Sequence, residues 1–289
     1  MSVFSLMSFF NPKRWIGNSI ASKLYTLLLM IGLLPMLVVG FSMYQWGYNG
    51  MEKLSFSQLN SIKTIKSKQV TDYFQLIRDQ VLTFSENQMI VEAMRAFPNA
   101  QANALLDAEI GSEELEMMKA KTLAFYNNEF ATEYRKRTDR IAPPPSNHFD
   151  HIDNDSLYLQ YQFISSNPEP LGKKDALVAP NDSTNYSVLH AKYHPIISSY
   201  QQKFGFYDIF LCDLESGDIV YSVFKELDFS TSLTTGPYKN TNFAKAFRQA
   251  AAAESHDEVY LVDYEKYTPS YEDAASCHWA LEKVPAMGA

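Results

Sequence analysis

Two groups of histidines have the spacing that metal sites use. His190 and His194 are four residues apart, so a helix would place both imidazoles on one face. His148 and His151 lie in a polar segment that also carries carboxylates, at Asp150, Asp153 and Asp155. The first pair has no assured third ligand, and a solvated loop explains the second group. We therefore predict no metal and no cofactor, and we expect His190 and His194 on a helix surface.

Catalytic patterns are missing from the sequence. It contains no serine nucleophile elbow, no phosphate-binding glycine loop and no H-E-x-x-H helix. Aspartates are numerous, but pairing two carboxylates for acid–base work is a matter of geometry rather than of sequence. We predict that these residues carry no enzymatic activity.

Charge and cysteine content exclude two further classes of protein. The 289 residues carry a formal net charge of -8, and no clustered basic face is visible, which argues against a nucleic-acid partner. The two cysteines are too few for a disulfide scaffold or a structural zinc site.

Residues 24–46 form an uncharged and strongly apolar run. A helix of about 20 such residues spans the hydrocarbon layer of a bilayer, so we predict a transmembrane helix here. The preceding flank contains no acid and three basic residues, Lys13, Arg14 and Lys23. The positive-inside rule therefore places residues 1–23 in the cytoplasm. A cleaved signal peptide is the alternative, but its apolar region is shorter and ends at small residues.

A long amphipathic helix is expected directly after the span. Residues 51–96 contain neither Gly nor Pro, and Pro98 is expected to end the helix. Apolar residues repeat at helical spacing along it, at Val70, Tyr73, Phe74, Ile77, Val81 and Phe84, and toward the span at Leu59, Ile62 and Ile65. This stripe faces either the helix's own domain or a second subunit, and both alternatives remain open.

The remaining elements predict an α+β fold. Helical periodicity marks residues 113–137 and 186–204, and a polar loop is expected at 147–155. Two short apolar runs, 207–213 and 219–223, flank a turn that contains Gly217 and predict a β-hairpin. A helix over 241–253 and a strand over 258–263 follow. This order is typical of an antiparallel sheet with helices on one side.

The chain resembles the N-terminal sensory region of bacterial methyl-accepting chemotaxis proteins that carry a Cache-type, PAS-like extracytoplasmic domain. The resemblance covers roughly residues 24–275 and rests on segments 58–74, 83–91, 167–175, 207–213, 217–226 and 236–238. It implies a transmembrane chemoreceptor whose outer domain senses a small molecule. Input regions of membrane-bound histidine kinases and nucleotide cyclases are similar, and they are the alternative. A purely structural membrane tether is a third hypothesis.

The resemblance also implies an organisation, a location and partners. It implies a cytoplasmic N-terminus at residues 1–23, a membrane helix at 24–46 and a long helical section at 47–142. The Cache-type sensor domain follows at 143–275, and an atypical tail at 276–289. The protein is expected in the cytoplasmic membrane as a homodimer, with its sensor domain periplasmic or extracellular. The lipid bilayer and a small-molecule ligand are its expected partners.

Ligand-binding residues follow from the PAS-like arrangement, in which the ligand lies between the sheet and the segments that cross it. Amphipathic candidates in that region are Tyr221, Lys225, Asp228, Tyr238, Asp263 and Tyr271. Their hydrogen-bonding ends and apolar bodies suit an amino acid or a carboxylate. The alternative is that the tyrosines pack with their hydroxyls at the surface and that Lys225 is solvated.

The tail departs from the resemblance. After Tyr271 such domains continue with more sheet, a second membrane helix and a cytoplasmic signalling module, whereas residues 277–289 read CHWALEKVPAMGA. We interpret this as a frameshift, a truncated gene or a fragment.

Overall fold

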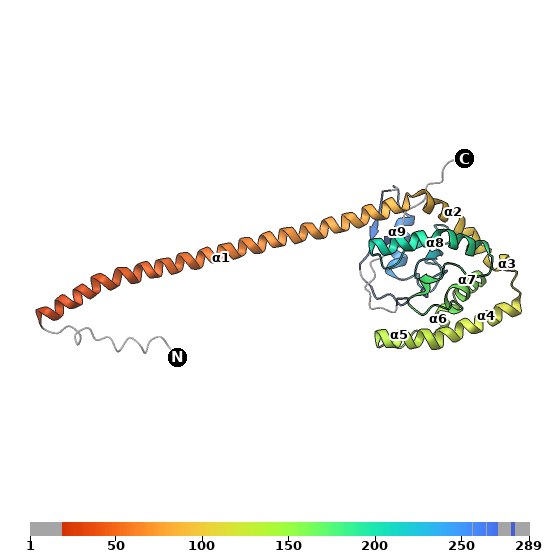
Figure 1. Ribbon diagram of the computed structural model, residues 1–289, viewed down its shortest axis with the longest axis horizontal. Helices are drawn as coiled ribbons and strands as arrows, with labels where there is room; N and C mark the ends of the chain where they lie inside the picture. The colour runs from red at the N-terminus through yellow and green to blue at the C-terminus, as the bar shows by residue number, and fades with distance from the viewer. Residues whose placement is uncertain (1–18, 256, 264, 271–278, 281–289) are drawn as a thin grey trace. The chain divides into compact units, whose positions relative to one another are not determined.

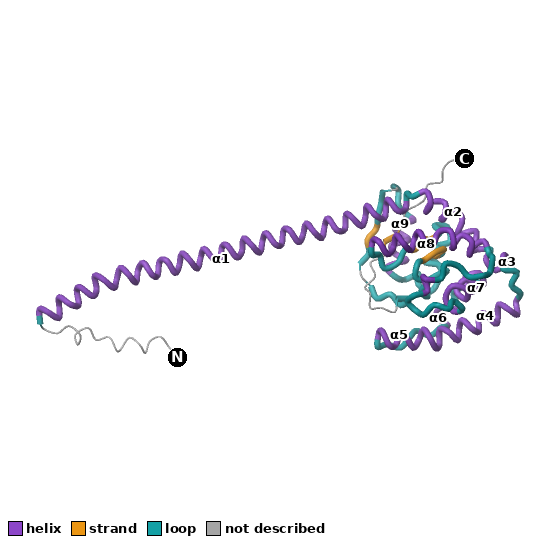
Figure 2. The backbone as a smooth tube through the Cα atoms, in the orientation of Figure 1, coloured by secondary structure: helices purple, strands orange, loops and turns teal. Residues whose placement is uncertain are grey.

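The computed structural model describes residues 19–255, 257–263, 265–270 and 279–280 (Figure 1). It separates into two compact units, Met1–Phe74 and Gln75–Ala289. The described chain is mostly helical with small antiparallel sheets, which is a loose α+β mixture (Figure 2). After helix α1 the helices are α2 (Gln88–Ala102), α3 (Ala104–Asp107), α4 (Ser112–Phe125), η4 (Tyr126–Phe130), α5 (Ala131–Thr138), α6 (Ser146–Phe149), α7 (Asn154–Gln160), η5 (Tyr161–Ser165), η6 (Lys174–Ala176), α8 (Asn185–Phe204) and α9 (Asn242–Ala251).

Helix α1 (Ile20–Ser85) contains the predicted membrane span and is long and apolar enough to cross a bilayer. Large apolar side chains of the span are exposed, for example Leu28 and Leu37, each at 68%. A helix from a soluble core would bury such residues, whereas lipid-facing residues have no need of protein contacts. Pro35 lies inside the helix, as membrane helices tolerate.

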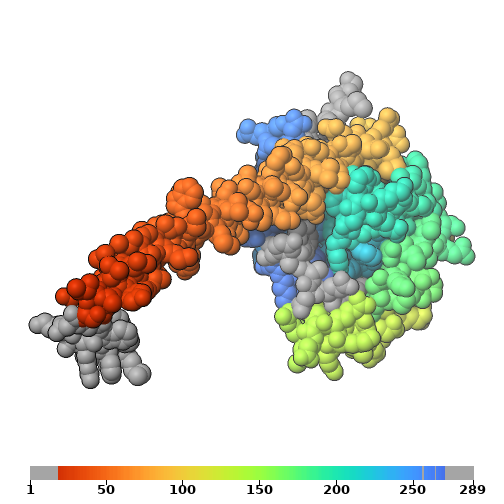
Figure 3. All heavy atoms as spheres, turned by 60° about the vertical axis from the view of Figure 1, so that its left-hand side comes forward, coloured from red at the N-terminus to blue at the C-terminus, as the bar shows by residue number. Residues whose placement is uncertain are grey.

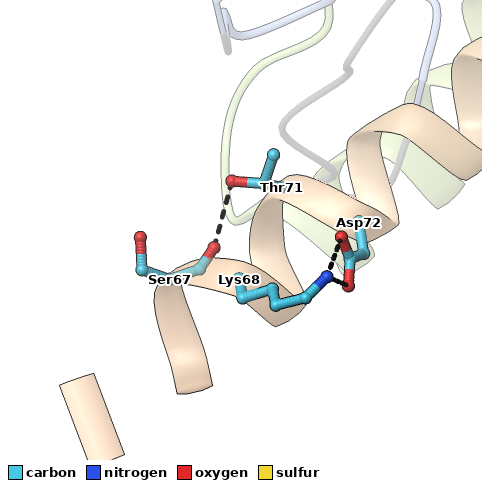
Figure 4. A network of polar contacts seen from close by, with 4 residues as sticks. All are labelled: Ser67, Lys68, Thr71 and Asp72. Carbon is cyan, nitrogen blue, oxygen red and sulfur yellow. Dashed lines mark hydrogen bonds and ion pairs between the residues drawn. The ribbon is translucent and has the colours of Figure 1, made fainter. Parts of the chain in front are cut away.

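The section of α1 that follows the span is amphipathic. Ile62 and Tyr73 of the apolar stripe are exposed in the first unit. Polar residues occupy another side of the helix, where the Nζ atom of Lys68 lies 2.8 Å from the Asp72 carboxylate (Figure 4). Such exposed pairs one turn apart contribute only about 0.3–0.5 kcal/mol to the stability of a helix. The apolar stripe of this section has no protein packed against it within the described part of the first unit.

The last turns of α1 belong to the second unit and are packed in it. Val81 and Phe84 are buried, and the ring of Phe84 lies 4.5 Å from that of Tyr200 on α8. The Tyr200 hydroxyl also donates a hydrogen bond to the carbonyl oxygen of Gln80 at 2.9 Å. Of the two interpretations of the stripe, packing on the helix's own domain therefore holds for this end.

The predicted helix over 51–96 is wrong in its C-terminal part. Helix α1 stops at Ser85, and Asn87 begins α2 by accepting a hydrogen bond from the amide of Met89 at 2.9 Å. Pro98 does not end the helix but lies inside α2. Proline removes one amide donor, and the buried Phe97 and Ala100 on either side hold the helix in the core.

Two further helical predictions are confirmed. The predicted helix over 113–137 corresponds to α4, the π-helical turn η4 and α5, and its apolar face is buried. The predicted helix over 186–204 corresponds to α8, which lies on the surface of the second unit beside α2 (Figure 3). The loop predicted at 147–155 is wrong in part, since α6 and the start of α7 occupy it. Asp153 caps α7 by accepting from the amide of Ser156, a signal that polarity alone does not reveal.

The predicted hairpin is confirmed as strands β1 (Phe210–Cys212) and β2 (Ile219–Ser222), paired antiparallel. Leu211 pairs with Tyr221, and the Tyr221 ring lies 5.6 Å from Phe97 of α2. Phe210, which points to the other face, lies 4.7 Å from Phe243 of α9. Helices therefore cover both faces of the hairpin. The predicted strand over 258–263 is short: β3 (Tyr260–Leu261) pairs with β4 (Trp279–Ala280).

Candidate functional site

Buried polar side chains gather where α8, strand β2 and the loop after β2 meet. We call this group the polar cluster; its members are His190, His194, Tyr221 and Lys225. The loop after β2 also buries Asp228 and Ser230. Each is at most 2% exposed. Helix α8 is joined to β2 by the Tyr186 hydroxyl, which donates to the carbonyl oxygen of Val220 at 2.7 Å. Because buried polar groups are costly unless they are bonded, their partners decide what the cluster can do.

Lys225 occupies a strained backbone position with φ of +57°. Its Nζ atom donates to the carbonyl oxygens of Ser222 at 2.5 Å and Val223 at 3.1 Å. It also lies 4.8 Å from the centre of the Tyr221 ring, with two further rings at longer distances, those of Phe163 and Phe229. The ammonium is thus held between backbone oxygens and aromatic faces.

The attraction of Asp208, followed by that of Asp175, opposes the lowering of the Lys225 pKa by burial. The Asp208 carboxylate accepts hydrogen bonds from the amides of Ile209 at 2.6 Å and Val223 at 2.8 Å. Burial raises the pKa of Asp208 and lowers the pKa of Lys225, while the attraction between the two groups opposes both shifts. The two groups therefore stabilise each other's charged forms at the end of β2.

The two histidines of α8 stack on each other, with ring centres 4.4 Å apart. The Nε2 atom of His194 lies 2.7 Å from the carbonyl oxygen of Asp175, which only accepts, so Nε2 carries the proton. Its Nδ1 atom then accepts from the Tyr221 hydroxyl at 2.7 Å. By the same argument His190 is protonated at Nδ1, which lies 2.5 Å from the carbonyl oxygen of Val178.

Burial keeps both rings neutral. It lowers the pKa of His194 to about 3, with repulsion by Lys225 as the second cause. The pKa of His190 is also lowered well below its usual value, first by burial and then by Lys225. The Nε2 atom of neutral His190 is therefore a bare acceptor, and it has no hydrogen-bond partner in the described part of the chain.

Two side chains of the loop after β2 also have unused bonding capacity. Asp228 accepts at Oδ2 from the Tyr267 hydroxyl at 2.6 Å, but within the described ranges Oδ1 has no partner. Ser230, at φ of +59°, likewise has an Oγ atom without a partner among the residues that the structure describes. Burial raises the pKa of Asp228 to about 6, and the bond from Tyr267 opposes the rise.

A second buried network anchors this loop to α7. The Nε2 atom of Gln160 donates to the carbonyl oxygens of Leu227 at 3.3 Å and Phe229 at 2.8 Å. Its Oε1 atom accepts from the Tyr126 hydroxyl at 3.1 Å and lies 2.8 Å from Nε2 of His148. His148 is therefore a buried part of this network rather than a residue of a solvated loop.

The predicted site residues separate into two groups. Four of them, Tyr221, Lys225, Asp228 and Tyr238, are buried in the second unit, so solvated lysine and surface hydroxyls are wrong as alternatives. Asp263 is exposed, and its carbonyl oxygen accepts from the Nδ2 atom of Asn242 at 3.0 Å. Tyr271 lies outside the described residues, as do most residues of the 276–289 tail.

Sequence reasoning missed His190 and His194 as site residues. We expected them on a helix surface, and this was wrong, since both are buried. Their four-residue spacing placed them on one face, but nothing in that spacing says that the face points inward. Tyr267 was missed because its bond to Asp228 exists only in the folded chain, and Ser230 was missed because its burial cannot be read from the sequence.

The neutral histidines predict a pH dependence that one substitution isolates. Below about pH 6.5 the unfolded chain protonates His194 whereas the folded chain does not until about pH 3, so stability falls as the pH falls. His194→Gln removes this titration. The stability of the wild type relative to the variant should drop by about 1.4 kcal/mol per pH unit between these limits. Urea unfolding at a series of pH values measures this difference; a constant difference would contradict the neutral buried ring.

Comparison of the chain with protein families, with curated proteins and with solved structures finds no match. The described part of the chain combines a helix able to span a membrane with a buried polar cluster that holds fixed charges and unused acceptors.

Proposed function

We propose that this protein is the extracytoplasmic small-molecule sensing module of a transmembrane chemoreceptor. Its N-terminus lies in the cytoplasm, α1 crosses the cytoplasmic membrane, and the second unit is a PAS-like domain of the Cache type on the outer side. The observation that carries the proposal is that one helix contains both the apolar span and the turns that pack in the domain with the polar cluster.

The polar cluster supplies the sensing half of the proposal. Buried acceptors at His190, Asp228 and Ser230 lack partners among the described residues, and an unbonded buried polar group costs about 1–3 kcal/mol. A ligand that supplies the missing bonds stabilises the state that it binds. The aromatic surroundings and the few fixed polar atoms fit a small polar metabolite, and amino acids are the class that we propose.

Helix α1 supplies the signalling half. Tyr200 and Phe84 join its last turns to α8, the helix that carries His190 and His194. A ligand shifts a conformational equilibrium only if it prefers one state, and contacts with α8 provide such a preference for one arrangement of α1. The exposed stripe upstream, with Leu59, Ile62 and Tyr73, is the surface on which a second subunit packs to form a homodimer.

Disulfide crosslinking tests this function. In a chain without native cysteines, we expect Ile62→Cys and Tyr73→Cys to form crosslinked dimers in membranes, whereas Lys68→Cys on the polar side does so several-fold less. Adding the small molecule that best stabilises the domain should change the relative yields along residues 59–84. Equal yields at all three positions would contradict the dimer, and yields unchanged by a bound ligand would contradict signalling through α1.

A further inference from the structure

Helix α8 carries its polar rings inward and aliphatic side chains outward. His190 and His194 are buried, whereas Val188 is 61% and Ile196 is 53% exposed. A surface helix of a soluble domain normally has the opposite arrangement, with its apolar stripe toward the core and polar residues toward water. The outer face of α8 therefore has the composition of a surface that another protein covers.

Apolar residues continue this outer face along the helix. Ala191 and Pro195 lie three and seven residues after Val188, and both are exposed. Lys192 lies among them, but its Nζ atom donates to the Tyr193 hydroxyl at 2.9 Å and lies 4.6 Å from the centre of that ring. The ammonium is thus held against Tyr193, while the methylene groups of the lysine add apolar surface. We call this surface the α8 face; it consists of Val188, Ala191, Pro195 and Ile196.

The α8 face lies on a helix that contacts α1. Tyr200, one turn after Ile196, donates to the carbonyl oxygen of Gln80, and Figure 3 shows the two helices beside each other on the surface of the second unit. Leu76 follows Tyr73 of the α1 stripe by three residues and is 55% exposed. The exposed stripe therefore reaches the second unit, where two adjacent helices both present apolar residues to the outside.

We propose that the α8 face packs against a second copy of this chain, in the same dimer that the stripe of α1 forms. The inference rests on the proposed sensor function and adds α8 to the surface through which the two subunits meet. A stable interface buries about 800 Å² on each partner. Residues 47–76 of α1 offer a strip roughly 45 Å long and about 10 Å wide, which is about half of that area. The α8 face, roughly 30 Å long, supplies most of the remainder.

This packing connects the polar cluster directly to the partner subunit. His190 and His194 lie on the inner side of α8, and Val188 and Ile196 lie on its outer side. A shift of α8 therefore changes the cluster and the subunit contact together. A ligand that prefers one position of α8 also prefers one arrangement of the dimer.

Thiol alkylation of the purified full chain in liposomes tests the inference, because no other protein is present to cover α8. In a chain without native cysteines, we compare Val188→Cys and Ile196→Cys with Ala124→Cys, a matched control on the exposed side of α4. All three positions are exposed in the single chain, so an uncovered α8 gives similar rates. We expect maleimide to react several-fold more slowly at positions 188 and 196 than at position 124.

Separating the subunits should remove this protection. Ile62→Glu puts a charge into the α1 stripe, and dilution with lipid lowers the dimer fraction by mass action. The loss of crosslinked Tyr73→Cys dimers verifies the separation. Alkylation at positions 188 and 196 should then reach the rate at position 124. Slow alkylation that persists in separated chains overturns the inference, because lipid or the chain itself then covers the face.

Equal rates at the three positions in undiluted liposomes also overturn the inference. If Ile62→Cys still forms crosslinked dimers in that case, the sensor function stands and only the α8 contact is wrong. If neither Ile62→Cys nor Tyr73→Cys forms dimers, the dimer of the proposed sensor fails together with it.

Discussion

Replacing Gln160 by alanine is expected to lower the free energy of unfolding of the second unit by about 4 kcal/mol. The change removes four bonding partners at once, because the Gln160 amide serves Leu227, Phe229, Tyr126 and His148. Each buried group left unpaired costs about 1–3 kcal/mol, and local rearrangement recovers part of the sum. Alanine favours the helix, so propensity opposes the loss only slightly.

Urea unfolding in detergent measures this loss. Gln202→Ala is the matched control, since Gln202 is an exposed glutamine of α8 with one long bond to Ser198 Oγ at 3.4 Å. We expect it to change stability by less than about 0.5 kcal/mol. Similar losses for the two variants would show that Gln160 does not anchor the loop.

Replacing Phe163 by alanine is expected to cost a similar amount, about 3–5 kcal/mol, because it leaves a cavity in a rigid part of the core. Phe163 is fully buried, and its ring lies 4.7 Å from His190 and 5.7 Å from Phe229. It also lies 5.9 Å from the Lys225 ammonium. The substitution therefore removes a wall of the polar cluster as well as a large apolar side chain.

The control for this cavity is Phe204→Ala at the end of α8, where the ring is 47% exposed. Partial exposure means that its loss should be about 1 kcal/mol or less. Unfolding free energies of both variants and the wild type, measured side by side, check the prediction. A loss at position 163 no larger than that at position 204 would contradict the packing described above.

The periodic spacing of apolar residues made much of the fold predictable. The apolar spacing of residues 113–137 predicted a buried helical face, and the turn at Gly217 predicted the hairpin. The spacing over 186–204 predicted the helix but not its buried face, since Ile196 and Phe204 are exposed. Gly217 adopts φ of +76°, and a Cβ atom there would lie 2.6 Å from a side-chain carbon of Thr234. The residues that cap the helices were harder to predict from the sequence. The break at Asn87 depends on one side-chain hydrogen bond inside a stretch whose apolar pattern continues without interruption.

The candidate site was predictable only in part. Tyr221, Lys225 and Asp228 stood out because polar ends occur among apolar residues of one short segment, and all three are buried. The unused acceptors of His190 and Asp228 could not be predicted, since they depend on which atoms the fold leaves without a donor. A helix long and apolar enough to cross a membrane was readable directly from composition. The PAS-like arrangement is part of the proposal, because the described sheets have two strands each.

We propose that the second unit binds a small molecule in its polar cluster. The most direct test is the unfolding midpoint of the full chain in the presence of a library of amino acids, amines and organic acids. A ligand present at about one hundred times its dissociation constant stabilises the folded state by about 2.7 kcal/mol. We expect at least one compound to raise the midpoint by several degrees and Asp228→Asn or Phe163→Ala to diminish this rise. A midpoint that no compound in the library changes would contradict it.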